Sequence, residues 1–330
     1  MLDQGERIRL APVQRQVLED LLAVDTPRPL ADPEAGPRLR AQLDAGLAEV
    51  AVLLPHTGGP LVVGKSMLDT LDCDGRFLDR LDTPFAWAPA MVAGTLAHTG
   101  IAVDLAGGWA RDPGEVVRHA WQAFAASGTP AGRYLAELGG AEADALRGRA
   151  LNLILEFREI FPPLPDWVTI RTEPDLAAVL LGGRLALRGK PDLAIGRALH
   201  AGRRRLLLVD LKTGRRNALR DRVDMRFYAL LATLKYGVAP FRVATFYLDE
   251  AGWDAEDVDG GVLEAAARTV IDKAARAVRL IHARPPDHEL RLVPSHSCHW
   301  CGRASACPER AGEQCSEEPA QDGWSLAGAG

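Results

Sequence analysis

The chain has 330 residues, of which 47% are hydrophobic, so it is long enough to bury a full core and a mainly disordered state is excluded. The formal net charge of −5 argues against a protein that simply coats nucleic acid, because such proteins bind through an excess of basic side chains. It does not exclude an enzyme, since metal-binding carboxylates offset basic residues in the total. No run of eighteen or more uncharged apolar residues occurs, and residues 1–10 lack the apolar stretch of a secretory signal. We therefore expect a soluble, cytoplasmic protein with no membrane contact.

The first half of the sequence predicts mainly helices. Up to about residue 60, apolar-periodic stretches alternate with Pro- and Gly-bearing breaks, which is typical of two helices joined by a loop. A helix over 66–80 is predicted by the start signal of Ser66 and Asp69 and by leucines that recur on one face, and Cys73 lies on it. Further helices are predicted over 90–106, 113–127 and 131–160.

The second half changes character. Short apolar runs bounded by Gly and Pro predict strands over 184–189, 191–199 and 204–212. A helix over 217–236 and a strand over 241–249 follow, and a last helix over about 261–283 precedes Pro285 and Pro286. The order of strand, strand, strand, helix, strand predicts an α/β domain preceded by a helical N-terminal region.

Charged residues at the ends of two predicted strands carry the clearest chemical signal. Pro191-Asp192 is followed, after seventeen residues, by Asp210-Leu211-Lys212 at the end of an apolar strand. Carboxylates at adjacent strand ends can converge on one divalent cation such as magnesium or manganese. Lys212 lies two residues beyond Asp210 and therefore on the same strand face, where it would orient or activate a metal-bound water. The alternative interpretation is a solvated strand end followed by a turn.

With these residues the chain resembles the PD-(D/E)XK nuclease superfamily, and within it the RecB-like branch with the CRISPR-associated adaptation nucleases and the AddB-type helicase–nuclease subunits. The resemblance covers about 64–310. In that branch an S-x-L segment followed by a cysteine precedes a G-x-x-x-H helix, and here these are 66–68 with Cys73 and then Gly94 to His98. The resemblance implies that His98 is a metal ligand alongside Asp192 and Asp210, with the carbonyl of Leu211. Without the family, a lone histidine on a helix is more often structural.

The helix after the D-x-K strand carries a further family motif. Relatives usually have Q-x-x-x-Y there, and this chain has Asp224 and Tyr228, which the spacing puts on one helix face. The resemblance implies that Tyr228 is a site residue. Asp224 departs from the glutamine and would either add a carboxylate near the metal or repel the phosphate. Glu173 either matches an acid that some relatives place before the PD strand or is a surface acid.

The cysteines form the second strong signal. Four of the five lie near the C-terminus, at Cys298, Cys301, Cys307 and Cys315, and in a reducing compartment they favour metal or cluster ligation over disulfides. The resemblance implies a four-cysteine iron–sulfur (4Fe–4S) cluster held by Cys73, Cys298, Cys301 and Cys307, although relatives usually have proline where this chain has Asp74. The competing interpretation is zinc held by the four C-terminal cysteines, with His296 or His299 also available.

For the arginines and the tryptophans, the sequence does not decide between a functional and a structural role. Arginines crowd the stretch over 203–226, where they would either grip phosphates or form a soluble surface. Five tryptophans would either stack on single-stranded bases or pack in the core: Trp109, Trp121, Trp167, Trp253 and Trp300.

Together these patterns predict a restriction-endonuclease-like mixed β-sheet core with a C-terminal cysteine clasp. We expect an N-terminal helical extension over 1–62, a nuclease domain over 63–312 and a flexible tail over 313–330. The expected activity is metal-dependent hydrolysis of DNA, and the resemblance implies an exonuclease that acts on free ends or single strands, in repair, recombination or defence. The alternatives are an inactive nucleic-acid-binding subunit beside a helicase and a zinc-bearing adaptor. No Walker-type phosphate loop occurs, so any helicase would be a partner.

Overall fold

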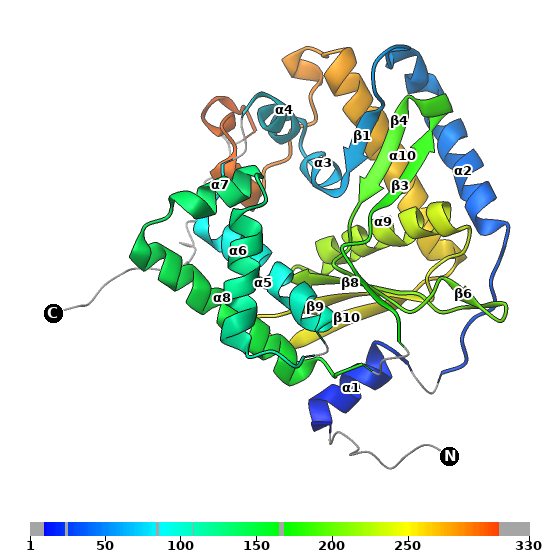
Figure 1. Ribbon diagram of the computed structural model, residues 1–330. Coiled ribbons are helices and arrows are strands. Elements are labelled where there is room, and N and C mark those ends of the chain that lie inside the picture. The colour runs from blue at the N-terminus through cyan, green and yellow to red at the C-terminus, as the bar shows by residue number, and fades with distance from the viewer. Residues whose placement is uncertain (1–9, 24–25, 84–85, 108, 165–167, 310–330) are drawn as a thin grey trace.

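A mixed five-stranded sheet lies at the centre of the protein (Figure 1). The computed structural model describes residues 10–23, 26–83, 86–107, 109–164 and 168–309. The sheet has the strand order β10-β9-β8-β5-β2. Its strands are β2 (Ile170–Thr172), β5 (Leu193–Ile195), β8 (Leu207–Lys212), β9 (Arg242–Tyr247) and β10 (Gly252–Asp257). Only β8 and β9 are parallel, and the other neighbours are antiparallel.

A second sheet of three strands stands beside the first (Figure 1). It has the order β1-β4-β3, with β1 (Leu61–Gly64) parallel to β4 (Leu185–Gly189) and β3 (Leu176–Leu180) antiparallel to it. A short two-stranded ribbon joins β6 (Leu199–His200) to β7 (Arg203–Arg204). Because β4 leads directly into the Pro191-Asp192 step and β5, the two sheets meet at the point where the sequence predicts its metal ligands.

Helices surround both sheets. Those of the first half are α1 (Pro12–Asp20), α2 (Ala35–Gly46), α3 (Lys65–Thr70), α4 (Asp74–Asp82), α5 (Pro89–Ala106), α6 (Pro113–Ala125), α7 (Pro130–Glu137) and α8 (Gly140–Ile160). The second half has α9 (Ala218–Tyr236) and α10 (Gly260–His282). Short 3₁₀ turns are η1 (Ala48–Leu53), η2 (Leu181–Gly183), η3 (Asp287–Glu289), η4 (His296–Trp300) and η5 (Ala304–Ala306).

The central strand β8 separates two hydrophobic cores by the alternation of its side chains. Leu208 points toward the core that contains α2, α9, α10 and the three-stranded sheet. Val209 and Leu211 point toward the other core, which contains α1, α5, α6 and α8. Asp210 and Lys212 lie on the same face of β8 as Leu208, because side chains alternate along a strand. They therefore extend toward α9 and not into the second core.

The observed elements agree with most of the expected ones. The expected helices over 90–106, 113–127, 217–236 and 261–283 are α5, α6, α9 and α10, and the mixed α/β class is confirmed. The single helix expected over 131–160 is wrong, because it is broken into α7 and α8 beside Gly139 and Gly140. The sequence analysis does not predict strands β1, β2, β3 and β10; β1 and β2 are only four and three residues long, and β10 is rich in acidic residues.

The single helix expected over 66–80 is also wrong, and the break places Cys73. Helix α3 ends at Thr70, and α4 begins at Asp74 with Cys73 as its extended N-cap residue. The N–H of Asp74 donates to the carbonyl of Arg291 at 2.9 Å, and the Asp74 carboxylate is fully buried against the Arg276 guanidinium. These long-range contacts stabilise the turn that a local propensity argument missed, and they bring Cys73 toward the C-terminal segment.

The ends of the chain fall partly outside the described residues, and these include Cys315 and the expected tail over 313–330. The helix α2 of the expected extension packs its leucines, Leu39 and Leu43, into the same core as α9 and α10. None of the described helices is long and apolar enough to cross a membrane.

Candidate active site

An open cavity of about 340 Å³ lies where α5, α9, β8 and the end of β4 meet. Its walls carry residues from segments that are far apart in the sequence, because the two sheets and both cores converge here. The site residues expected from the sequence that line it are His98, Asp192, Asp210, Lys212 and Tyr228. Lys65, Lys190, Gly94, Thr95 and Thr213 line it as well.

The strand register brings the two aspartates together. Asp192 immediately precedes β5, whose Leu193 pairs with Val209 of β8, so Asp192 lies beside Asp210 and Leu211. The N–H of Leu211 donates to Asp192 Oδ2 at 2.6 Å. Because Leu211 points its side chain into the opposite core, its backbone is fixed and Asp192 is held at the strand end.

The closeness of Asp192 and Asp210 is electrostatically unfavourable. Burial raises the pKa of Asp210, and the negative charge of Asp192 raises it further, against the opposing charge of Lys212. Lys212 Nζ contacts Asp210 Oδ2 at 2.7 Å. The buried Asp210 and the partly buried Asp192, with Lys212 paired to Asp210, form a site that a cation would stabilise.

His98 extends from α5 toward this pair. Its Nδ1 lies 3.0 Å from Asp192 Oδ1, while its Nε2 is buried and has no hydrogen-bond partner among the described residues. Burial alone would lower the pKa of His98, but Asp192 outweighs it and holds the pKa above its usual value. The unused Nε2 is the kind of atom that a metal ion or a substrate would engage.

Gly94 sets the approach of this helix. A Cβ atom at Gly94 would lie 2.6 Å from Thr213 Oγ1, so only glycine lets α5 pack this closely on the end of β8. Gly94 stands one turn before His98 on the same helix face. The G-x-x-x-H spacing therefore has a steric reason: the glycine makes the contact that aims the histidine.

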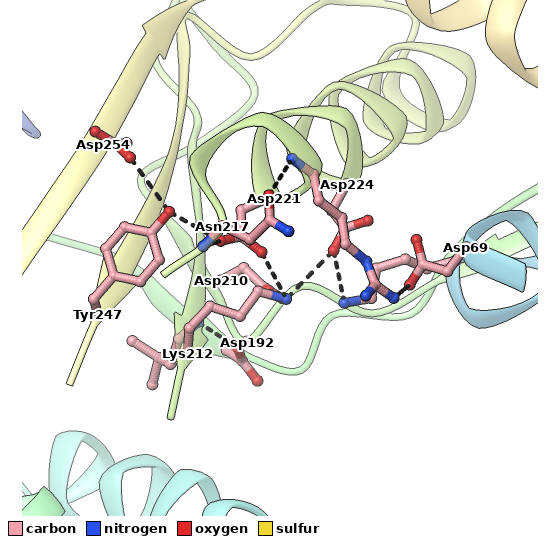
Figure 2. A network of polar contacts seen from close by, with 12 residues as sticks. Asp69, Asp192, Asp210, Lys212, Asn217, Asp221, Asp224, Tyr247 and Asp254 are labelled. Carbon is pink, nitrogen blue, oxygen red and sulfur yellow. Dashed lines mark hydrogen bonds and ion pairs between the residues drawn. The ribbon is translucent and has the colours of Figure 1, made fainter. Parts of the chain in front are cut away.

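Lys212 is held by two carboxylates rather than one. Besides Asp210, it donates to Asp224 Oδ2 at 3.3 Å, and Asp221 lies 3.9 Å away (Figure 2). Asp224 also accepts from Lys65 Nζ at 3.1 Å. Burial alone would lower the pKa of Lys212, but Asp210 and Asp224 outweigh it and raise the pKa well above the ordinary value. The two carboxylates therefore favour the charged form of Lys212.

Tyr228 packs one turn after Asp224 on α9 and faces the same cavity. A Cβ atom at Gly189 would lie 2.8 Å from Tyr228 Cε1, so the glycine at the end of β4 makes room for the ring. Burial and then the charge of Asp210 raise the pKa of Tyr228. Its hydroxyl is therefore a donor and not a base at neutral pH.

A family model described as the PD-(D/E)XK nuclease superfamily matches residues 71–308 of the chain. The chain belongs to this superfamily. The match covers the PD step, the D-x-K strand and the three cysteines of the C-terminal segment that the structure describes, and it confirms the restriction-endonuclease-like fold. Members of the superfamily hydrolyse phosphodiester bonds, and they typically use magnesium or manganese.

Solved structures give more distant likenesses. The protein SSO0001 is 14% identical with a TM-score of 0.36, over 83% of this chain and 98% of that one. A protein of Eubacterium rectale, provisionally described as an exonuclease, is 12% identical with a TM-score of 0.41, over 78% of this chain and 89% of that one. A comparison with curated proteins gives no match. The family assignment rests on the match over 71–308.

Other residues singled out in the sequence lie away from this PD-(D/E)XK cavity or serve the fold. Glu173 is exposed, and its N–H donates to the carbonyl of Asp192 at 2.8 Å. Several arginines of the stretch over 203–226 have partners within the chain: Arg203 on Arg28, Arg204 on Val258, Arg216 on Asp254, Arg220 on Asp69 and Arg226 on Glu256. These contacts favour the structural use of the arginines that make them.

The tryptophans divide in the same way. Trp109, Trp121 and Trp253 pack against core residues, with Trp253 stacked on Phe246. Trp167 lies outside the described residues. Trp300 is 69% exposed on η4, where it contacts the rings of two histidines.

The cysteines surround a second cavity of about 340 Å³ between α4 and the C-terminal segment. Cys73, Cys298, Cys301 and Cys307 all line it, and all four are free thiols of intermediate exposure. Burial raises the pKa of the Cys301 thiol, and the neighbouring Asp79, Cys73 and Cys298 raise it further. Within the described ranges, no three His, Cys, Asp or Glu side chains converge closely enough to hold a single metal ion.

Two buried aspartates of α4 hold the C-terminal segment in place. Asp74 binds Arg276 of α10 and the N–H of Arg291, and Asp79 accepts from the N–H of Gly302 at 3.0 Å. A Cβ atom at Gly302 would lie 2.7 Å from Asp79 Oδ1, so a glycine after Cys301 leaves room for the Asp79 carboxylate. Asp74, which stands where relatives have proline, thus supplies both an N–H and a carboxylate that proline lacks.

The sequence argument missed the part of the active site around Lys65. Neither Lys65 nor Asp221 is among the site residues that the sequence predicts, although Lys65 is one of only five lysines in the chain. Asp221 accepts from the hydroxyl of Tyr247 at 3.0 Å, and its other carboxylate oxygen lies 3.9 Å from Lys212 Nζ (Figure 2). The available signal was the rarity of lysine, together with an Asp where relatives have Gln.

Proposed function

We propose that this cavity is the active site of a metal-dependent DNA nuclease of the RecB-like branch, which acts as an exonuclease on free ends or single strands. The observation that carries the proposal is the pair Asp192 and Asp210, held side by side on neighbouring strands beside Lys212. A buried pair of carboxylates is costly to a fold unless a cation or a substrate uses it.

The residues present fit magnesium or manganese. Both ions prefer oxygen ligands, and the unpaired Nε2 of His98 adds a nitrogen that manganese accepts readily. In this proposal Asp192, Asp210 and His98 would draw together around the ion, with the carbonyl of Leu211, since among the described residues no three such side chains yet converge on one point. When bound, such an ion neutralises phosphate charge and lowers the pKa of a coordinated water.

Lys212 and Tyr228 act on the substrate side. Lys212, held by Asp210 and Asp224, would orient the attacking water and stabilise charge on the phosphate. The raised pKa of Tyr228 keeps its hydroxyl as a hydrogen-bond donor to a phosphate oxygen. Positioning and charge stabilisation account for most of the catalysis in phosphoryl transfer.

For the cysteine cavity we favour a 4Fe–4S cluster over zinc, as the resemblance implies. A structural zinc ion needs four ligands within about 2.3 Å of one point, whereas a cluster separates its four thiolates around a larger body. Cys73, Cys298, Cys301 and Cys307 line one cavity of about 340 Å³, which has room for a body larger than a single ion. Bound there, the cluster would join Cys73 to the C-terminal cysteines and close a very long loop around the nuclease domain.

The cellular context of the proposal comes from the resemblance. Work in repair, recombination or defence, beside a separate helicase, is what the RecB-like branch implies. Purification partners from the native cell would identify such a helicase.

The test is a cleavage assay on end-labelled single- and double-stranded DNA and RNA, with manganese, magnesium or chelator. Anaerobically purified wild-type protein is compared with Lys212→Gln and with Lys235→Gln, a lysine at the exposed end of α9 that contacts a backbone carbonyl. We expect metal-dependent loss of the end label from DNA in the wild type and in Lys235→Gln. Lys212→Gln should reduce the rate about a hundredfold or more.

Two results would contradict the proposal. Cleavage that persists in chelator would exclude the metal role of the cavity. A folded wild type that leaves every substrate intact, with the same DNA affinity as Lys212→Gln, would favour the inactive binding subunit.

A further inference from the structure

Asp224 stands where related nucleases carry glutamine, and it joins two lysines of the active-site cavity. Its Oδ2 accepts from Lys65 Nζ at 3.1 Å and from Lys212 Nζ at 3.3 Å. The Asp224 side chain is only 4% exposed. A glutamine carbonyl could accept the same hydrogen bonds, but it carries no charge to balance a second ammonium group. The aspartate at 224, unlike the glutamine of relatives, therefore supplies the negative charge that balances the ammonium group of Lys65.

The fold fixes Lys65 at the mouth of the cavity. Lys65 is the first residue of α3 and follows β1 directly. The parallel pairing of β1 with β4 sets Gly64 opposite Arg188, so both strands end at the same cavity. The Lys65 side chain is 27% exposed and lines this cavity together with Lys212. Its ammonium group is therefore accessible to a ligand that enters the site.

We propose that Lys65 is a second phosphate-binding lysine of this nuclease and that Asp224 is a positioning residue that holds Lys65 and Lys212 side by side. The inference rests on the proposed function and names residues of the same site. Asp192, Asp210 and Asp224 would repel a DNA phosphate, and a second ammonium group at the cavity wall offsets part of that repulsion. Asp224 acts through the two lysines and does not itself touch the substrate.

The competing explanation is that Lys65 and Asp224 only tie α3 to α9. The chain offers a matched lysine for this comparison. Lys273 of α10 also bonds to the α3 region, through the carbonyl of Leu68 at 2.9 Å and Asp72 at 2.8 Å, and its side chain is 15% exposed. Lys273 does not line the active-site cavity, so its loss affects packing without affecting a phosphate contact.

The first test measures binding of a single-stranded oligodeoxynucleotide in chelator, at several salt concentrations. A lysine that contacts one phosphate contributes about 0.7 to the slope of log affinity against log salt for a single strand. We expect Lys65→Met to lower the slope by about this amount and Lys65→Arg to restore it. Lys273→Met should bind with the wild-type slope.

The second test uses Asp224→Asn, with Asp224→Glu as the variant that keeps the charge. Loss of the negative charge should tighten DNA binding, because one source of repulsion beside the phosphate disappears. Loss of the anchor should lower kcat about tenfold or more, because Lys212 and Lys65 are no longer held in place. A purely structural residue would not move binding and kcat in opposite directions.

These outcomes distinguish a failure of the proposed nuclease function from a failure of the roles given to Lys65 and Asp224. Binding is measured without metal, so a wild type that binds DNA but does not cleave it contradicts the proposed function and still tests Lys65 and Asp224. An unchanged salt slope in Lys65→Met, or weaker DNA binding in Asp224→Asn, would overturn the inference. So would a wild type that does not bind the oligonucleotide.

Discussion

The active-site cavity and the cysteine cavity both bring together distant parts of the chain, but the protein holds them in different ways. The active-site residues stand on β8, α5 and α9 and already contact one another through hydrogen bonds and ion pairs. Their geometry follows from two hydrophobic cores and a strand register. This site is therefore organised by the polypeptide itself.

The cysteine cavity has much weaker internal contacts. Cys298 and Cys301 stand on and beside a short 3₁₀ turn, and the contacts to sulfur include N–H groups of Val293 and Ser295 at 3.5 and 3.3 Å. The segment is fastened at its edges, by Asp74 and Asp79 of α4. The comparison teaches that the residues of the active-site cavity are arranged by direct contacts with one another, whereas the cysteines are arranged mainly by contacts of their neighbours.

Among the variants that test this comparison, Asp210→Asn should have the largest effect, which is on the cleavage rate. Asp210→Asn should lower the cleavage rate about a thousandfold or more, because the cation loses a ligand. Folding stability at pH 7 should stay the same or rise. The folded pKa of Asp210 is raised, so its ionised form is disfavoured by the fold and the amide removes that cost. Cleavage rates and urea unfolding measure both, and Asp175→Asn is the exposed control.

The cysteine side of the comparison is tested by Cys301→Ser. We expect this variant to lose its iron and about 3 kcal/mol of unfolding free energy, because a link that closes a very long loop is lost. Cys315→Ser should keep iron and stability. The measurements are iron and zinc content, visible absorption and urea unfolding. Loss of bound metal in Cys315→Ser would instead favour the zinc interpretation.

The contact that fastens the cysteine segment is tested by Asp74→Ala. It leaves the Arg276 guanidinium without its buried partner, which should cost about 2 to 3 kcal/mol of unfolding free energy. Asp72→Ala removes an exposed aspartate of the same region and should cost less than about 1 kcal/mol. Equal effects of the two variants in urea unfolding would show that Asp74 does not fasten the segment.

The smallest expected effect is a pH dependence of stability at His98. The folded pKa of His98 is raised by Asp192, so the stabilisation by the pair is fully present below the unfolded value of about 6.5 and is lost as pH rises through the higher folded value. In chelator, wild-type stability should therefore fall relative to His98→Asn as the pH rises above about 6.5. Parallel stability curves of the two proteins would contradict this.

The sequence predicts the active-site cavity better than the cysteine cavity. The first is marked by short local motifs, whereas the second depends on contacts between residues far apart in the chain. The PD step, the D-x-K strand and the G-x-x-x-H helix are short motifs, and their residues do meet in one cavity. The break before Asp74 depends on Arg276 and Arg291, more than two hundred residues away, so no local pattern could reveal it. The role of Lys65 depends on the pairing of β1 with β4, and β1 has only four residues and pairs with a strand more than a hundred residues away.

The most direct test of the central claim is manganese binding, measured by electron paramagnetic resonance, in the wild type and in His98→Asn, Asp192→Asn and Asp210→Asn. We predict that the wild type binds manganese saturably and that each substitution weakens binding by about tenfold or more, in parallel with the loss of DNA cleavage. Equal manganese affinity in all four proteins would contradict the account, because the cavity would then not be the metal site of this nuclease.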